Sequence, residues 1–408
     1  MRSKLLLFAV CGVLAASVFT EAQQPVATNI SAKRAESSYM PAPPVLKALA
    51  RRIVTQSARV KEGDIVLING SVRDMELLED IAVEVQKQGG YPLISVFSER
   101  LGRMSYADVP EKYDSKPPKL GMALAKMANV SINVEGVESP DYLADVSPAR
   151  MAARAKAGES VSAEYRKNGV RFVNVGNDLY PTAWRAKNYE MPIDGFARLF
   201  WDGVNIDYSA LQTSGEKMRT MLAGKVMEIT HPNGTNLKFN IAPTPVFVSD
   251  GVITDEDARN GNLNVYLPAG EAVVIPAANS GSGKFVVDLD YVNGKEVRNA
   301  VYTFENGKLV SMTGEGEGFA ELKKYYDAAG PGKEILGYAD IGINPNYVLS
   351  PKSKYGNWIS AGMVSVGSGG NTWAGGTNTS SGGAGGHLAG ATVKVDGRVI
   401  VENGVLKP

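Results

Sequence analysis

The chain contains very little cysteine and histidine. Among its 408 residues there are one cysteine, Cys11, and two histidines, His231 and His387. A single cysteine excludes an intramolecular disulfide framework and the cysteine-rich classes of zinc site. The charges balance at 43 Lys and Arg against 43 Asp and Glu, and the sequence carries no basic stripe or nucleic-acid-binding motif. We therefore expect no nucleic-acid partner.

The first 44 residues have the composition of a leader and a linker. Arg2 and Lys4 precede an apolar run at residues 5–19, and Glu21 follows the run. This layout is typical of a signal peptide. The run is shorter than the roughly 20 residues that a membrane span needs. We predict a signal peptide at residues 1–22, a linker at 23–44 without helical or strand periodicity, and an exported, periplasmic or secreted protein with no stable membrane span.

The fold class follows from the hydrophobic pattern. Apolar strands are predicted at residues 65–68, 91–97, 130–134 and 170–175, with helical or polar segments between them, and such continuous apolar strands favour a parallel sheet. From residue 225 onward the chain changes to short strands divided by turns. The sequence predicts an α/β domain with a parallel sheet at 45–210, followed by a β-rich α+β domain at 211–408.

Two short motifs have a structural reading as well as a functional one. Asn69-Gly70-Ser71 follows the first strand, but no G-x-G-x-x-G or G-x-x-x-x-G-K-[ST] pattern accompanies it, which favours a turn over a phosphate loop. His231 opens a Pro-Asn-Gly turn without neighbours at metal-ligand spacing, so a turn residue is favoured over a ligand.

Glu271 is the first candidate functional residue. It follows the strand at residues 264–267 and a Pro-Ala-Gly turn, and it precedes an apolar strand at 272–275. If buried, this carboxylate needs a cation, a metal or hydrogen-bond donors, whereas an exposed hairpin acid needs none. Asp288 and Asp290 are predicted on one face of a later strand, where they form either a site or a solvated edge.

Four segments, taken in order, carry a resemblance to a known family. They are Val-Lys-Glu-Gly-Asp-Ile-Val-Leu-Ile at 60–68, His-Pro-Asn-Gly-Thr-Asn-Leu-Lys-Phe at 231–239, Asn-Val-Tyr-Leu-Pro-Ala-Gly-Glu at 264–271 and Gly-Ile-Asn-Pro at 342–345. From about residue 45 onward the chain resembles the thermophilic-type metal-dependent aminopeptidases. The resemblance implies a dimer that encloses its sites, a peptide substrate, two divalent metals in the β-rich domain, and Glu271 as a metal ligand.

Most of the other ligands implied by this resemblance are missing. A further family glutamate falls on Tyr338, a histidine on or near Met363, and a late His-x-Asp pair reads His387-Leu388-Ala389. No Asp or Glu lies between Asp340 and Asp396, and His387 is the only histidine there. The two-metal centre of a hydrolase needs more carboxylate and imidazole groups than this segment supplies.

Three residues remain as candidate ligands of one metal: Glu271, Asp340 and His387. Asp340 lies two residues after Tyr338, so on a strand it faces the same way and can take the place of the missing glutamate. Zinc, cobalt or manganese is the expected ion unless the site has been lost, and the sequence identifies no catalytic base.

Two hypotheses therefore stand. The first is an exported metal-dependent aminopeptidase with a depleted metal site, and the second is a non-catalytic member of the family that binds peptides or small ligands. The Gly-rich segment at residues 367–386 is predicted either as a flexible lid over the site or as a packed rim.

Overall fold

Helices and parallel strands alternate through the first half of the computed structural model, which describes residues 40–138, 140–177, 179–259, 262–292, 294–348 and 359–407. The predicted signal peptide and most of the predicted linker lie outside the described residues. Residues 39–408 form one compact unit. The boundary near residue 210 between the two predicted domains stays a prediction.

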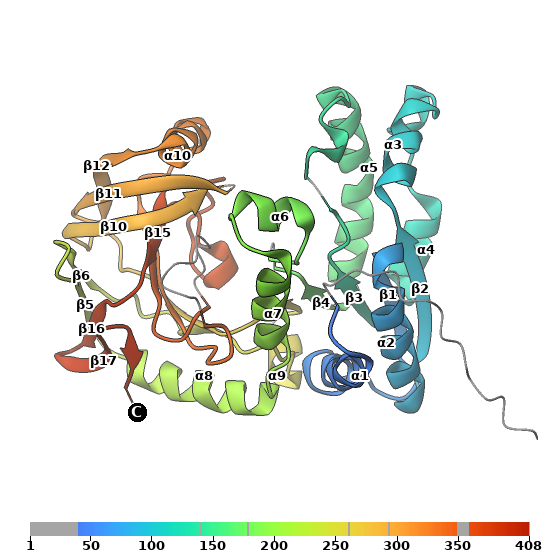
Figure 1. Cartoon of the computed structure of the whole chain (residues 1–408), viewed down its shortest axis with the longest axis horizontal. Helices are drawn as coiled ribbons and strands as arrows, with labels where there is room; N and C mark the ends of the chain where they lie inside the picture. The colour runs from blue at the N-terminus through green and yellow to red at the C-terminus, as the bar shows by residue number, and fades with distance from the viewer. Residues whose placement is uncertain are drawn as a thin grey trace, which may run out of the picture. The chain divides into compact units, whose positions relative to one another are not determined.

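The first sheet is parallel and confirms the predicted α/β class (Figure 1). Its order is β2-β1-β3-β4-β8, in which β1 (Ile65–Ser71) lies between β2 (Tyr91–Phe97) and β3 (Val130–Val134), followed by β4 (Arg171–Val175) and β8 (Asn264–Leu267). Helix α2 packs against β1 and β2, and α4 packs against α5. The helices in this half are α1 (Pro43–Arg52), α2 (Met75–Lys87), α3 (Glu99–Ala107), α4 (Lys119–Met127), α5 (Pro148–Lys167), α6 (Ala183–Asn188), α7 (Ile193–Val204) and α8 (Tyr208–Leu222).

Local sequence explains where these helices begin and end. Helix α1 starts at Pro43, which has no amide proton to leave unpaired. The side chain of Ser98 accepts a hydrogen bond from the Leu101 amide at the start of α3, and the side chain of Asp207 accepts one from the Ser209 amide at the start of α8. Gly89, at φ +76°, allows the chain to turn after α2 into β2.

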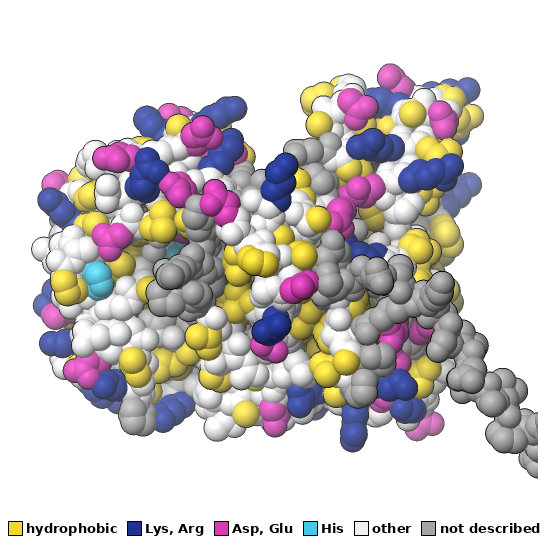
Figure 2. All heavy atoms as spheres, in the orientation of Figure 1, with side chains coloured by type: hydrophobic (Ala, Val, Ile, Leu, Met, Phe, Trp, Pro, Cys, Tyr) yellow, Lys and Arg dark blue, Asp and Glu magenta, His cyan; other side chains and the backbone are white. Residues whose placement is uncertain are grey.

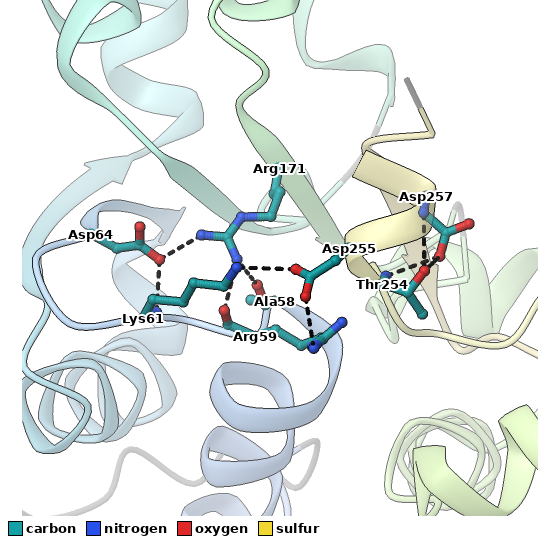
Figure 3. A network of polar contacts seen from close by, with 8 residues as sticks. All are labelled: Ala58, Arg59, Lys61, Asp64, Arg171, Thr254, Asp255 and Asp257. Atoms are coloured by element: carbon teal, nitrogen blue, oxygen red, sulfur yellow. Dashed lines mark hydrogen bonds and ion pairs between the residues drawn. The ribbon is translucent and has the colours of Figure 1, made fainter. Parts of the chain in front are cut away.

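A polar network links β4 and the segment before β8 to residues 58–64, which precede β1 (Figure 3). The Arg171 guanidinium donates to the backbone carbonyls of Ala58 and Arg59 at 2.9 and 2.7 Å and to the Asp64 carboxylate at 2.5 Å. At the start of α9 (Asp255–Arg259), Asp255 pairs with Lys61 at 3.0 Å. The segment that leads into β8, and so to Glu271, is thus fastened to the α/β half of the chain.

After residue 225, the described strands other than β8 are antiparallel and form three sheets, which confirms the β-rich class. The sheet that contains Glu271, here called the central sheet, has the order β15-β14-β13-β9-β7. Its strands are β7 (Phe247–Ser249), β9 (Glu271–Val274), β13 (Leu336–Gly342), β14 (Val364–Ser368) and β15 (Gly385–Leu388). One face of the central sheet, with Ala272, Val274, Ala339 and Ile341, packs into the main hydrophobic core.

Two further antiparallel sheets accompany the central sheet, and strand β10 (Gly283–Val292) of one of them contacts β15. One has β10, β11 (Lys295–Glu305) and β12 (Lys308–Glu315), against which helix α10 (Glu317–Ala328) packs (Figure 1). The other has β6 (Asn236–Asn240), β5 (Val226–Thr230), β16 (Thr392–Val395), β17 (Arg398–Glu402) and β18 (Val405–Leu406). None of the described helices is long and apolar enough to cross a bilayer.

Asp288 and Asp290 do not share a face, contrary to the prediction from simple alternation. Asp288 is exposed, whereas Asp290 is buried. The alternation of buried and exposed side chains changes phase along β10 between Val287 and Asp290. Opposite this point lies Asn299 of β11, whose φ is +50°. The irregular backbone at this pair turns Asp290 inward.

Candidate functional site

The second face of the central sheet carries the candidate functional residues. Glu271 pairs with Gly342 across β9 and β13, and Asp340 pairs with Val273, so both acids lie on the same face. Asp340 also pairs with Ser365 on β14, and Ser365 in turn pairs with His387 on β15. The four strands thus place the side chains of Glu271, Asp340, Ser365 and His387 along one surface.

Buried Asn344 holds the turn before Glu271. Its side-chain amide donates to the carbonyls of Gly203 and Ala269 at 3.0 and 2.7 Å, and its side-chain oxygen accepts from the amides of Asn346 and Tyr347. The Pro-Ala-Gly-Glu turn and the Gly-Ile-Asn-Pro segment therefore contact each other. Gly270, at φ +134°, is required there because a β-carbon on it would lie 2.5 Å from that of Asn344.

Glu271 and Asp340 form a buried carboxyl pair joined by a hydrogen bond. Burial raises the pKa of Glu271 to about 7, and the hydrogen bond from Asp340 limits that rise. Burial, together with the charge of Glu271, raises the pKa of Asp340 well above its ordinary value. Asp340 therefore holds the shared proton and donates it to Glu271. Oδ1 of Asp340 is buried without a hydrogen-bond partner.

Tyr338 lies beside this pair on the same strand. Its hydroxyl forms a hydrogen bond with Ser365, while burial and the nearby Asp340 raise its pKa to about 12. The ring lies across β14 at Gly367, where an added β-carbon would be 2.6 Å from the ring and its hydroxyl. Tyr338 therefore stays protonated at neutral pH and offers a hydroxyl group, not a negative charge.

His387 is held by an acid from another sheet. Its Nδ1 lies 2.9 Å from Oδ2 of Asp290, and the same carboxylate oxygen accepts from the His387 backbone amide at 3.0 Å. Burial lowers the pKa of His387, but the Asp290 charge and hydrogen bond outweigh it and raise that pKa above its ordinary value. The imidazole is thus oriented toward β10 and favours its charged form.

The structure brings Glu271 and Asp340 together but does not add His387 to the same group. His387 lies two strands away from Asp340, with Ser365 between them, and two strand spacings amount to about 10 Å. Within the described ranges, no three His, Cys, Asp or Glu side chains are placed to hold a metal ion. The roles of Glu271, Asp340 and His387 as metal ligands stay predictions.

The remaining motifs have ordinary structural positions. His231 accepts a hydrogen bond at Nδ1 from the Asn233 amide at 3.2 Å, within its own turn. Lys, Arg, Asp and Glu side chains are interspersed over the face in Figure 2, where no patch of one sign stands out. The Asn69 amide group donates to the side-chain oxygen of Asn133 on the neighbouring strand, at 2.8 Å.

Sequence-based reasoning did not assign Ser365 or Trp373 to this surface, and it named Asp290 without its partner His387. The pairing of Asp290 with His387 joins positions 97 residues apart. Ser365 lies in an apolar strand without a motif, and Trp373 lies inside the Gly-rich segment. The one signal available for Tyr338 was its two-residue spacing from Asp340, which places both on one face.

Comparisons with known proteins agree on one family. A family model described as "Thermophilic metalloprotease (M29)" matches residues 44–328. "Aminopeptidase 2" of Geobacillus stearothermophilus is 23% identical over 304 residues, which cover 69% of this chain and 72% of that protein.

Solved structures show the same fold. "Wild-type AmpT from Thermus thermophilus" superposes with a TM-score of 0.64 at 16% identity and covers 90% of this chain and 99% of that chain. The 2,5-dihydroxypyridine dioxygenase of Pseudomonas putida KT2440 superposes with a TM-score of 0.52 at 13% identity, covering 90% and 98%. Since a peptidase family and a dioxygenase share this architecture, the fold alone does not decide the chemistry.

Proposed function

The chain belongs to the thermophilic metalloprotease family M29, and from this premise we propose that it is an exported aminopeptidase that acts on the N-terminal residues of peptides. In this proposal the two-metal centre is reduced to one divalent cation at the Glu271–Asp340 pair. The observation that carries it is the buried carboxyl pair itself, which shares a proton and leaves Oδ1 of Asp340 without a partner.

The donor set fits one cation and does not fit two. Two carboxyl groups that share one proton are the groups whose proton a divalent cation displaces, and waters complete the shell of ions such as manganese. Zinc and cobalt are the other expected ions. A second metal would need further ligands, and the described residues contain no group of three His, Cys, Asp or Glu side chains that could hold a metal ion. When bound, the cation would supply Lewis-acid polarisation of a carbonyl group.

The chain's own residues supply the rest of the site. Glu271, which keeps part of its surface exposed, lies at the edge of the carboxyl pair that a peptide N-terminus can approach. Tyr338 and Ser365 contribute hydroxyl groups, and His387, held by Asp290, contributes an imidazole group.

Metal uptake and hydrolysis test this proposal together. Mature protein equilibrated with zinc, cobalt or manganese is expected to retain metal after desalting and to release arylamine from leucyl and other aminoacyl arylamides. Glu271→Gln is expected to abolish both. A matched control is Glu228→Gln, which removes a surface carboxylate on β5 that pairs with Lys238. Wild-type protein that retains no metal and releases no arylamine with any of the three ions would contradict the proposal.

A non-catalytic peptide-binding protein is the second candidate. The observation that favours it is the distance of His387 from the carboxyl pair, which leaves a cation there with two carboxyl ligands from the part of the chain that the structure describes. Calorimetry with unlabelled di- and tripeptides separates the two candidates. Peptide binding that needs a free N-terminal amine, without hydrolysis under any of the metal conditions, is the result expected for the second.

Export and dimerisation complete the proposal. The charged and apolar pattern of residues 1–22 supports removal of a signal peptide, and the family resemblance supports a homodimer. N-terminal sequencing of protein from the native host is expected to start near Gln23. Light scattering of the purified mature chain is expected to give twice the mass of one chain.

A further inference from the structure

Three aromatic side chains meet beside the carboxyl pair. Trp373 makes edge-to-face contacts with Tyr338 at 5.5 Å and with Phe247 at 5.9 Å between ring centroids. We call Phe247, Tyr338 and Trp373 the aromatic cluster. It packs on the buried side chains of Val273, Ile275 and Ala374, which form a small hydrophobic group separate from the main core. Apolar surface is thus gathered on the face of the sheet that carries the acids.

Strand register fixes the spacing between this cluster and the acids. Phe247 pairs with Val273, and two residues further along the same two strands Ser249 pairs with Glu271. Tyr338 likewise precedes Asp340 by two residues on β13. Two residues span about 7 Å along a strand, which is the distance between the charged and the apolar parts of this surface.

Trp373 presents apolar surface to solvent. It is 49% exposed, although its neighbours Val273 and Ala374 are buried. Its indole N–H donates to the Gly370 carbonyl at 3.2 Å, so its polar atom is already paired. A half-exposed tryptophan with a satisfied N–H offers a ring and no further donor, which suits contact with an apolar group.

The loop that carries Trp373 is pinned by two asparagine side chains. Asn371 is buried, donates to the Gly337 carbonyl at 2.9 Å and accepts from the Asn378 amide at 2.9 Å. Asn378 donates to the carbonyls of Gly332 and Gly369 at 2.9 and 2.8 Å. These bonds fix the tryptophan relative to β13 before any ligand arrives, so little ordering is needed on binding.

We infer that the aromatic cluster is the subsite for a large apolar or aromatic side chain on the first residue of a peptide, whose amino group lies beside the Glu271–Asp340 pair. The inference rests on the proposed function and adds the substrate class to it. The ligand chemistry is a primary amine with an aryl or branched alkyl group a few bonds away. The spacing of about 7 Å between acid and aromatic rings matches such a residue.

Two non-hydrolysable amino alcohols test the subsite directly. L-Phenylalaninol and ethanolamine carry the same ammonium and hydroxyl groups and differ by one benzyl group. Calorimetry with the mature protein is expected to show about tenfold tighter binding of L-phenylalaninol, the effect of partly burying one aromatic ring. Trp373→Ala is expected to remove this preference without weakening ethanolamine, and Trp373→Phe to keep most of it.

The controls separate this inference from the proposed function. Tyr91→Ala removes a 66% exposed aromatic side chain from β2 and is expected to leave both affinities unchanged. Glu271→Gln is expected to weaken both amino alcohols alike. If wild-type protein binds both amino alcohols equally, or if Trp373→Ala keeps the preference, the inferred aromatic subsite is wrong. The proposed function of the carboxyl pair is not affected by that result. If neither binds, the proposed function fails and the subsite with it.

Discussion

Asn344 makes four hydrogen bonds from a fully buried side chain, and these bonds place Glu271. Asn344→Ala leaves the carbonyls of Gly203 and Ala269 without this donor in the protein interior. The expected loss of unfolding free energy is about 2–4 kcal/mol, measured by urea denaturation. Asn262→Ala, at an exposed position, is the matched control and is expected to change stability by less than about 0.5 kcal/mol. Equal effects of both substitutions would show that Asn344 does not hold the turn.

The carboxyl pair gives the cation-free protein a defined pH dependence. Because the pKa of Glu271 is raised from 4.5 to about 7 in the folded protein, folding favours its protonated form. The stabilisation is complete below about pH 4.5 and is lost as the pH rises to about 7. His387, whose pKa is also raised, adds a loss of the same sign at higher pH.

Comparison with Glu271→Gln isolates the contribution of the pair. In EDTA, the unfolding free energy of the variant relative to wild type is expected to increase between pH 4.5 and 8, because the variant carries no charge to bury there. A series of thermal or urea unfolding curves across this range measures it. A difference that stays constant with pH would mean that Glu271 is solvated and has an ordinary pKa.

At the scale of single residues, the sequence predicted part of this site. The two-residue spacing from Tyr338 placed Asp340 on the right face, and it does meet Glu271. The partner of His387 was not predictable. Asp290 turns inward only because the alternation along β10 changes phase, and no local sequence pattern announces that change.

Among the elements, β14 depends on a glycine where Tyr338 crosses it. Gly367→Ala would place a β-carbon 2.6 Å from the Tyr338 ring, so the ring or the strand must move. The expected cost is about 1–3 kcal/mol, together with a changed near-ultraviolet spectrum, since Tyr338 contacts Trp373.

A second glycine provides the control for this substitution. Gly158 lies within helix α5, and an added β-carbon there meets nothing within 4 Å. Gly158→Ala is expected to stabilise the protein by about 0.5–1 kcal/mol through the better helix propensity of alanine. A Gly367→Ala variant as stable as Gly158→Ala would contradict the assigned contact between Gly367 and Tyr338.

Strand and helix positions were mostly predictable, and pairings between distant strands were not. The apolar runs at residues 91–97 and 130–134 coincide with β2 and β3. The expected strand at 264–267 also forms, but it joins the parallel sheet beside β4 although it follows three strands of antiparallel sheets. The spacing of apolar residues along the sequence identifies a strand. Which other strand it pairs with depends on packing between distant parts of the chain.

For the molecule as a whole, the Arg171 network connects residues 58–64, which precede β1, to β4. Arg171→Met leaves the partly buried Asp64 carboxylate and two backbone carbonyls without their guanidinium partner. The expected loss of unfolding free energy is about 3 kcal/mol. Lys61→Ala breaks the exposed pair with Asp255 in the same network and is expected to have no measurable effect. If the two variants lose similar stability in urea, the network acts through surface charge and not through buried contacts.

The central claim is that a single divalent cation binds at the Glu271–Asp340 pair. Manganese binding followed by electron paramagnetic resonance, with the mature chain at known concentration, tests it most directly. We expect one bound ion per chain in wild-type protein, and loss of that ion in both Glu271→Gln and Asp340→Asn, while His387→Gln retains it. Two ions per chain, no bound ion, or one ion that survives both carboxyl substitutions would contradict the account.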